Sequence, residues 1–174
     1  MKLGLAILRA AIGALHVGHG AQKLFGAFGG GGPEGTGMFF ESAGLRPGKP
    51  MAQAAGASEI AGGALLTLGW GTPLAAAMLS GVHLVAIRAV HLDKGPWVTN
   101  GGFEYNATLL AALFAITDVG PGDLSVDALL GTERSGPGYA LAQLAVAGGA
   151  AAAVLTATQG RPGGGPHEAA TGGA

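Results

Sequence analysis

Residues 3–25, with the sequence LGLAILRAAIGALHVGHGAQKLF, form an apolar block with the length of a membrane-spanning helix. At about 1.5 Å per residue, such a helix crosses the roughly 30 Å of hydrocarbon in a bilayer. A cleaved signal peptide is the alternative, but Arg9 interrupts the block and no small-residue cleavage site follows it cleanly. We therefore expect a permanent transmembrane helix here.

Further apolar blocks follow at 51–70, 73–90 and 103–119, and a weaker candidate lies at 139–158. The short break GWGTP between the second and third blocks requires an antiparallel hairpin, and the piece GMFFESAGL before them is expected at the membrane interface. The sequence thus predicts an all-α membrane protein with a four-helix transmembrane bundle in residues 1–130 and an additional C-terminal transmembrane helix. Residues 159–174 are of low complexity and are expected to be disordered.

The composition supports a bilayer environment. Of the 174 residues, 49% are hydrophobic and only 11% are charged, against about 25% charged in an ordinary soluble domain. The net charge of -1 and the lack of a basic stripe argue against nucleic-acid binding. Without cysteine the chain offers no disulfide, thiol chemistry or iron–sulfur ligation, so any redox chemistry must use a bound cofactor, a quinone or a partner.

Four ionisable residues interrupt the first block, and on a helical wheel they fall within about 80° of one another. A central arginine that faced lipid would cost roughly 2.5 to 3.5 kcal/mol. Gly13 and Gly20 lie beside this polar face, as expected where two helices pack closely. We therefore expect the face to point into the bundle. Its ionisable members are Arg9, His16, His19 and Lys23.

Antiparallel helices place further ionisable residues at matching depths. His16, Glu59 and His83 are expected near mid-membrane, with Arg9 nearer the opposite side. A polar intramembrane site is therefore predicted, in which Glu59 pairs with His16 or Arg9; a purely structural ion pair is the alternative. The residues predicted for this site are Arg9, His16, His19, Lys23, Glu59, His83, Arg88 and Glu104.

The charged residues near the helix ends also have purely structural explanations. Arg88 and Glu104 could form a helix-end salt bridge, and Lys23 could extend to the head groups. Within the expected spans there are three strong bases and only two acids, and this excess of positive charge favours a partly anionic ligand. The bases are Arg9, Lys23 and Arg88, and the acids are Glu59 and Glu104. Metal binding is not predicted, since the acidic residues after the fourth block lack the spacing of a calcium loop and are expected to form a solvated loop. These residues are Asp118, Asp123, Asp127 and Glu133.

Several motifs in a fixed order resemble those of a known family. They are RAAIGALHVGHGAQKL, FFESAGL, ASEIAGGALLTLGWGTPLAA, GGFEYNATLL and GPGDLSVDALL. Over roughly the first 130 residues this pattern resembles the DoxX family of small bacterial inner-membrane proteins. The resemblance implies a four-helix membrane core, a multi-pass location in the bacterial plasma membrane and an association with membrane oxidoreductases such as thiosulfate:quinone oxidoreductase.

Three functions remain open at this point. The first is a membrane subunit of a quinone-linked redox system, which acts with a soluble or membrane oxidoreductase partner. The second, less favoured, is a b-type haem protein with His16 and His83 as axial ligands. The third is a non-enzymatic scaffold or small-molecule transporter. An oligomeric assembly also remains open, and the positive-inside rule, applied to the few charges that flank the spans, places the first loop in the cytoplasm.

Overall fold

The computed structural model describes residues 3–159, and this part of the chain is helical without strands. The expected tail, residues 159–174, lies outside the described residues except for Gln159, the last residue of the final helix. The main helices are α1 (Leu3–Phe25), α2 (Gly32–Ser42), α3 (Gly48–Leu68), α4 (Thr72–Ala86), α5 (Glu104–Val119), α6 (Val126–Leu130) and α7 (Pro137–Gln159). Short 3-10 turns lie at Ala27–Gly29, Leu92–Lys94 and Val98–Asn100, and a π-helical turn, Ile87–His91, extends α4.

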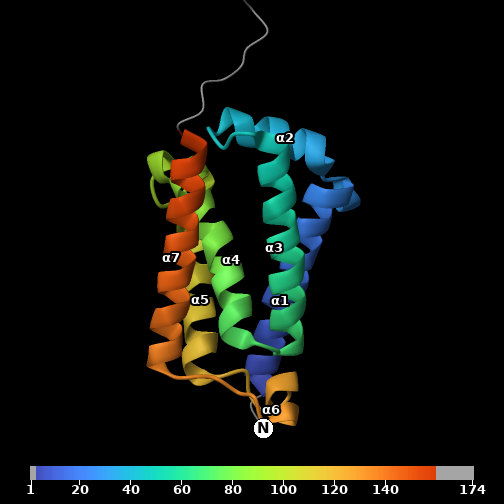
Figure 1. Cartoon of the computed structure of the whole chain (residues 1–174), viewed down its shortest axis with the longest axis vertical. Helices are drawn as coiled ribbons and strands as arrows, with labels where there is room; N and C mark the ends of the chain where they lie inside the picture. The colour runs from blue at the N-terminus through green and yellow to red at the C-terminus, as the bar shows by residue number, and fades with distance from the viewer. Residues whose placement is uncertain (1–2, 160–174) are drawn as a thin grey trace, which may run out of the picture.

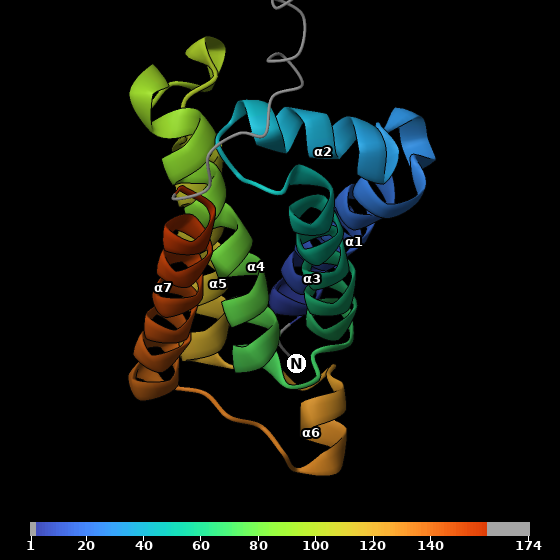
Figure 2. The ribbon, with the colours of Figure 1, turned by 45° about the horizontal axis from the view of Figure 1, so that its top comes forward.

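Helices α1, α3, α4, α5 and α7 run roughly along one axis, and α2 lies across one end of them (Figure 1). We call this the α2 end, and we call the opposite end, where Gly69–Gly71 connect α3 to α4, the turn end. Helix α1 packs against α3, while α4 packs against both α5 and α7, and α3–α4 packing joins the two sets. Figure 2 shows the resulting two groups, one of α1, α2 and α3 and the other of α4, α5 and α7.

The contact between α1 and α3 depends on glycine. A Cβ atom built on Gly20 would lie 2.5 Å from the backbone oxygen of Gly56, and one on Gly63 would lie 2.6 Å from that of Gly13. No side chain fits at either place, so the two backbones approach as closely as small residues permit. The prediction that Gly13 and Gly20 form a packing surface is therefore confirmed.

The apolar core lies toward the turn end and joins the two helix groups there. Its side chains come from the first half of α1 and α4 and from the second half of α3 and α5, which meet because neighbouring helices are antiparallel. The core residues are Ile12, Leu66, Ala75, Ala76, Leu79, Leu113 and Ile116. The α2 end has no comparable buried cluster within the described residues.

Two charged side chains hold the turn end together. The buried guanidinium of Arg9 donates to the carbonyls of Leu66 (3.2 Å) and Thr67 (3.3 Å) at the end of α3, and to that of Leu124 (2.5 Å). A cation is favourable there, because the last carbonyls of a helix carry partial negative charge. Arg9 thus joins α1, α3 and the segment before α6.

Asp127 on α6 plays the corresponding role at the N-terminus of α4, where its negative charge is favourable. Its carboxylate accepts hydrogen bonds from the amides of Gly71 (3.1 Å) and Thr72 (3.2 Å) and from the hydroxyls of Thr72 and Thr132. Burial acts to raise the pKa of Asp127, but these hydrogen bonds outweigh it and hold the pKa below its usual value. The expectation that this acidic residue belongs to a solvated loop is wrong: Asp127 is only 2% exposed, because it caps a helix.

Three helical segments are long and apolar enough to cross a membrane: Leu3–Phe25, Thr72–Lys94 and Pro137–Thr158. The expected spans at 51–70 and 103–119 are also helices, α3 and α5, with similar bounds. Neither of them meets the same criterion, since α5 has only 16 residues and α3 contains several polar residues and glycines. The all-helical membrane architecture is confirmed, whereas the count of four spans stays a prediction.

Candidate functional site

A cavity of about 640 Å³ lies between the two helix groups. It extends from the middle of α1 toward α2 and along α4 and α7, so most of it lies beyond the apolar core. Its walls are mainly apolar, with Phe39 and Phe40 from α2, Met51 from α3 and Val154 from α7. Ionisable or amide side chains from α1, α3, α5 and the extended α4 also line it: His16, His19, Lys23, Glu59, His83, His91, Tyr105 and Asn106.

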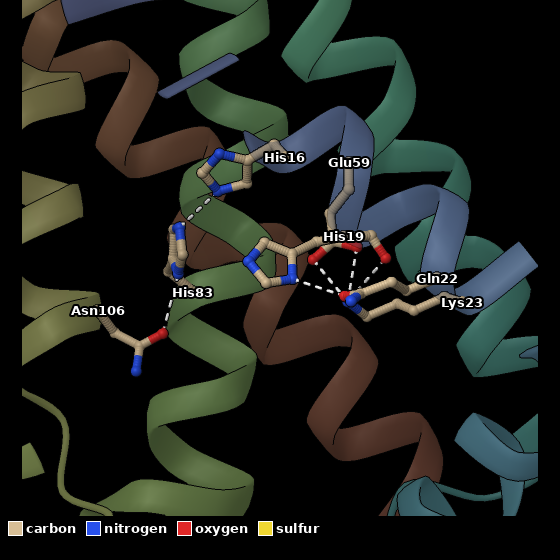
Figure 3. A network of polar contacts seen from close by, with 7 residues as sticks. All are labelled: His16, His19, Gln22, Lys23, Glu59, His83 and Asn106. Carbon is tan, nitrogen blue, oxygen red and sulfur yellow. Dashed lines mark hydrogen bonds and ion pairs between the residues drawn. The ribbon is translucent and has the colours of Figure 1, made fainter. Parts of the chain in front are cut away.

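A pair of histidines bridges the two helix groups at this cavity. The Nε2 atoms of His16 on α1 and His83 on α4 lie 2.9 Å apart, and the rings meet edge to face with centroids 5.1 Å apart. The outer nitrogens have partners too: His16 Nδ1 lies 2.7 Å from the carbonyl oxygen of Ile12, and His83 Nδ1 lies 2.9 Å from the amide of Asn106 on α5. Figure 3 shows this chain of contacts.

An ion pair lies next to the histidines within the first helix group (Figure 3). Lys23 Nζ is 2.9 Å from Oε1 and 2.7 Å from Oε2 of Glu59, and both side chains are largely buried. His19, one turn before Lys23, is exposed and contacts the side-chain oxygen of Gln22 at 3.0 Å. Since the lysine and the carboxylate neutralise each other, the fixed charges beside the cavity sum to zero.

A sequence model of the DoxX family matches residues 4–92, just over half of the chain. This chain belongs to the DoxX family. The match covers α1 to α4 and includes His16, Lys23, Glu59 and His83, whereas Asn106 lies beyond it. Comparison with curated proteins found no match, and neither did comparison with solved structures. The resemblance extends further in the sequence motifs, to about residue 130, and that extent stays a prediction.

The DoxX chain brings together part of the predicted polar site. His16, Lys23, Glu59 and His83 are at one cavity, and His19 lines its edge. Arg9 is buried but lies at the turn end, bound to backbone carbonyls, and is not among the residues that line the cavity. Its position follows from the seven residues, about 10 Å of helix, that separate it from His16.

Two expected pairings are wrong. Glu59 pairs with Lys23, where His16 or Arg9 was expected, because the long lysine side chain reaches across the α1–α3 contact. Within residues 3–159 no salt bridge joins Arg88 to Glu104: Arg88 is exposed, and Glu104 instead accepts a hydrogen bond from the Val98 amide at 2.7 Å. With Arg9 and Arg88 outside the cavity, the excess of bases that favoured an anionic guest is also absent there.

Two amide side chains, those of Asn106 and Gln143, were not predicted as functional or structural contacts from the sequence. Asn106 holds His83, and Gln143 on α7 donates to the hydroxyl of Ser80 at 2.7 Å, which fixes α7 to α4. Both residues were visible as single polar positions inside apolar blocks. In lipid such a position requires a hydrogen-bond partner, and this cost was the signal that could have identified them.

The histidine pair does not fit an axially ligated haem. Metal–imidazole bonds are roughly 2 Å long, so an iron atom between two rings holds their nitrogens about 4 Å apart. In this protein the Nε2 atoms of His16 and His83 contact each other directly at 2.9 Å. Within the described residues there is also no cluster of three or more acidic or histidine side chains suited to a metal ion.

Proposed function

We propose that this DoxX protein binds a quinone-like amphiphile in the cavity between its helix groups, as the membrane subunit of a redox system. One observation carries the proposal: a mainly apolar cavity of about 640 Å³ meets a hydrogen-bonding histidine pair inside a membrane protein. Binding cavities for small amphiphiles combine these two features, an apolar body and a few placed polar groups.

The residues present fit such a ligand. Phe39, Phe40 and Val154 offer apolar surface for a ring or an isoprenoid tail, while His16 and His83 offer hydrogen bonds to ring oxygens. A bound quinone would supply two-electron redox chemistry. Imidazoles suit the accompanying proton transfers, because each ring has one nitrogen that can donate a proton and one that can accept it. The Lys23–Glu59 ion pair joins α1 to α3 beside the same cavity.

The electrons would come from a partner, since the chain contains no cysteine. We propose a soluble or membrane oxidoreductase in this role, and the multi-pass location in a bacterial plasma membrane is part of the same proposal. Membrane fractionation and co-purification from a native host would test both. A chain found in the soluble fraction, or alone in the membrane, would contradict them.

Binding can be measured on the purified protein by titration with a decyl-quinone analogue. We expect saturable binding that weakens at least tenfold in His83→Leu, because the ring oxygens lose a polar partner. Arg88→Gln is the matched control, since Arg88 is exposed and does not line the cavity. Absence of binding, or equal binding by all three proteins, would remove the proposed function.

A scaffold role is the second candidate, favoured by how the polar side chains are paired. His16 with His83 and Lys23 with Glu59 already satisfy one another, as they would if their task were to fix helix packing. In that case the titration shows no binding, while the variants unfold at lower temperature and the partner still co-purifies with the wild-type chain.

A further inference from the structure

The His16–His83 contact has a special place in the fold. Among residues 3–159 it is the only hydrogen bond that joins a helix of the first group, α1 to α3, directly to a helix of the second group, α4, α5 and α7. Both rings line the cavity, and they are 3% and 7% exposed. A polar head group that enters between the groups therefore competes with this one bond.

The hydrogen-bond pattern fixes what the two nitrogens offer. His16 Nδ1 must carry a proton, because its partner, the Ile12 carbonyl oxygen, only accepts. A hydrogen bond between two nitrogens contains one N–H and one lone pair. Hence one Nε2 is a donor and the other an acceptor, whichever way the Asn106 amide faces and whether the pair is neutral or carries one extra proton.

From this donor–acceptor pair we infer that the cavity selects an uncharged, hydroxyl-bearing amphiphile, a phenol or quinol in preference to a quinone. A hydroxyl accepts from one imidazole and donates to the other, so it replaces the histidine bond without loss. A carbonyl or ether oxygen only accepts, and it leaves the second nitrogen buried with an unsatisfied lone pair. The inference rests on the proposed function, since it names the form of ligand that the same cavity prefers.

The surroundings of the pair support an uncharged head group. Lys23 and Glu59 neutralise each other on the α1 and α3 side, Asn106 is the polar neighbour on α5, and the cavity-lining residues of α7 are Val146, Ala150, Ala151 and Val154. The other titratable side chains that line the cavity are His19 on its exposed edge, His91 after α4 and Tyr105 on α5, none of which carries a permanent charge. No net fixed charge is therefore available to balance an ionised ligand.

Three ligands that share one ring and one decyl tail test the inference: a hydroquinone, its dimethyl ether and the corresponding quinone, titrated anaerobically on the purified protein. Leaving one buried polar atom unpaired corresponds to a loss of roughly 5- to 150-fold in affinity. We therefore expect the hydroquinone to bind at least about fivefold more tightly than the other two. In His83→Phe the remaining His16 Nε2 offers a lone pair that only a hydroxyl can satisfy, so the hydroquinone should still bind more tightly than the other two, but more weakly than in the wild type, because it has lost its second imidazole partner.

A second measurement does not depend on a variant that folds. In protein labelled with ¹⁵N-histidine, the bond between the rings should appear as a scalar coupling between the two Nε2 nuclei, and saturating hydroquinone should abolish it. A coupling that persists in the bound state would overturn the inference. Equal affinity for the ether or the quinone would overturn it while leaving the proposed function intact, and no binding of any of the three would remove both.

Discussion

A single methyl group added to Gly20 should separate α1 from α3. The new Cβ would lie 2.5 Å from the backbone oxygen of Gly56, 2.6 Å from Cγ1 of Ile60 and 3.0 Å from its backbone nitrogen. Ordinary contact begins at 3.4 Å. Gly18 provides the matched control, because it lies on the same helix and a Cβ there would meet nothing within 4 Å.

The size of the effect follows from these distances. To reach ordinary contact, α1 must move away from α3 by about 0.9 Å, since a backbone oxygen cannot rotate aside as a side chain can. Overpacking of this kind costs about 1–3 kcal/mol. Both variants replace a helical glycine by alanine, so the difference between them isolates the clash. Gly20→Ala should therefore be about 1–3 kcal/mol less stable than Gly18→Ala.

Thermal unfolding of the proteins in one detergent checks this, with roughly 2–4 °C expected for each kcal/mol in a chain of this size. We expect Gly18→Ala to unfold at or above the wild-type temperature and Gly20→Ala several degrees below it. Equal unfolding temperatures for the two variants would refute the close glycine contact between α1 and α3.

Two further outcomes follow from the buried charges. Lys23→Met should lower the free energy of unfolding by up to about 3 kcal/mol, because it leaves the Glu59 carboxylate buried without its cation. Adding Glu59→Gln should restore most of that loss. A thermal double-mutant cycle with purely additive effects would contradict this. The pKa of Asp127 is held below its usual 3.8, so its hydrogen bonds stabilise the fold fully above the unfolded-state pKa, and this stability is lost as the pH falls through the lower folded-state pKa. Below about the unfolded-state pKa, the free energy of unfolding should therefore depend less on pH in Asp127→Asn than in the wild type. An equal pH dependence in the two proteins would contradict the capping role of Asp127.

The fold was largely predictable because its main determinant is local. Apolar blocks separated by glycine and proline specify helices in lipid, and the predicted block at 73–90 agrees closely with α4 and its π-helical extension. The helix α2 was harder to predict, since GMFFESAGL is short and its place depends on contact with α3. The sharp hairpin at GWGTP was visible because positive φ angles at Gly69 and Gly71 suit glycine.

The candidate site was predictable only in part. Depth along antiparallel helices placed His16 and His83 at the same level, and the structure puts them in contact. The rotation of each helix about its own axis and the distance that each side chain spans could not be predicted from the sequence. The Lys23 side chain extends far enough to form an ion pair with Glu59, while the Arg9 side chain donates hydrogen bonds to the carbonyls at the end of α3. To predict the role of Asn106, one would have to know which face of α5 lies toward His83.

The short length of α5 has a consequence for the surrounding lipid. Its 16 residues rise only about 24 Å, several ångströms less than the hydrocarbon layer of a typical bilayer, whereas the 23 residues of α1 rise about 34 Å. A membrane-crossing α5, which stays a prediction, would require the neighbouring lipids to compress or tilt their acyl chains, at a modest free-energy cost per ångström. Bilayers of shorter-chain lipids should accordingly hold this protein with less deformation than thick, sterol-rich ones.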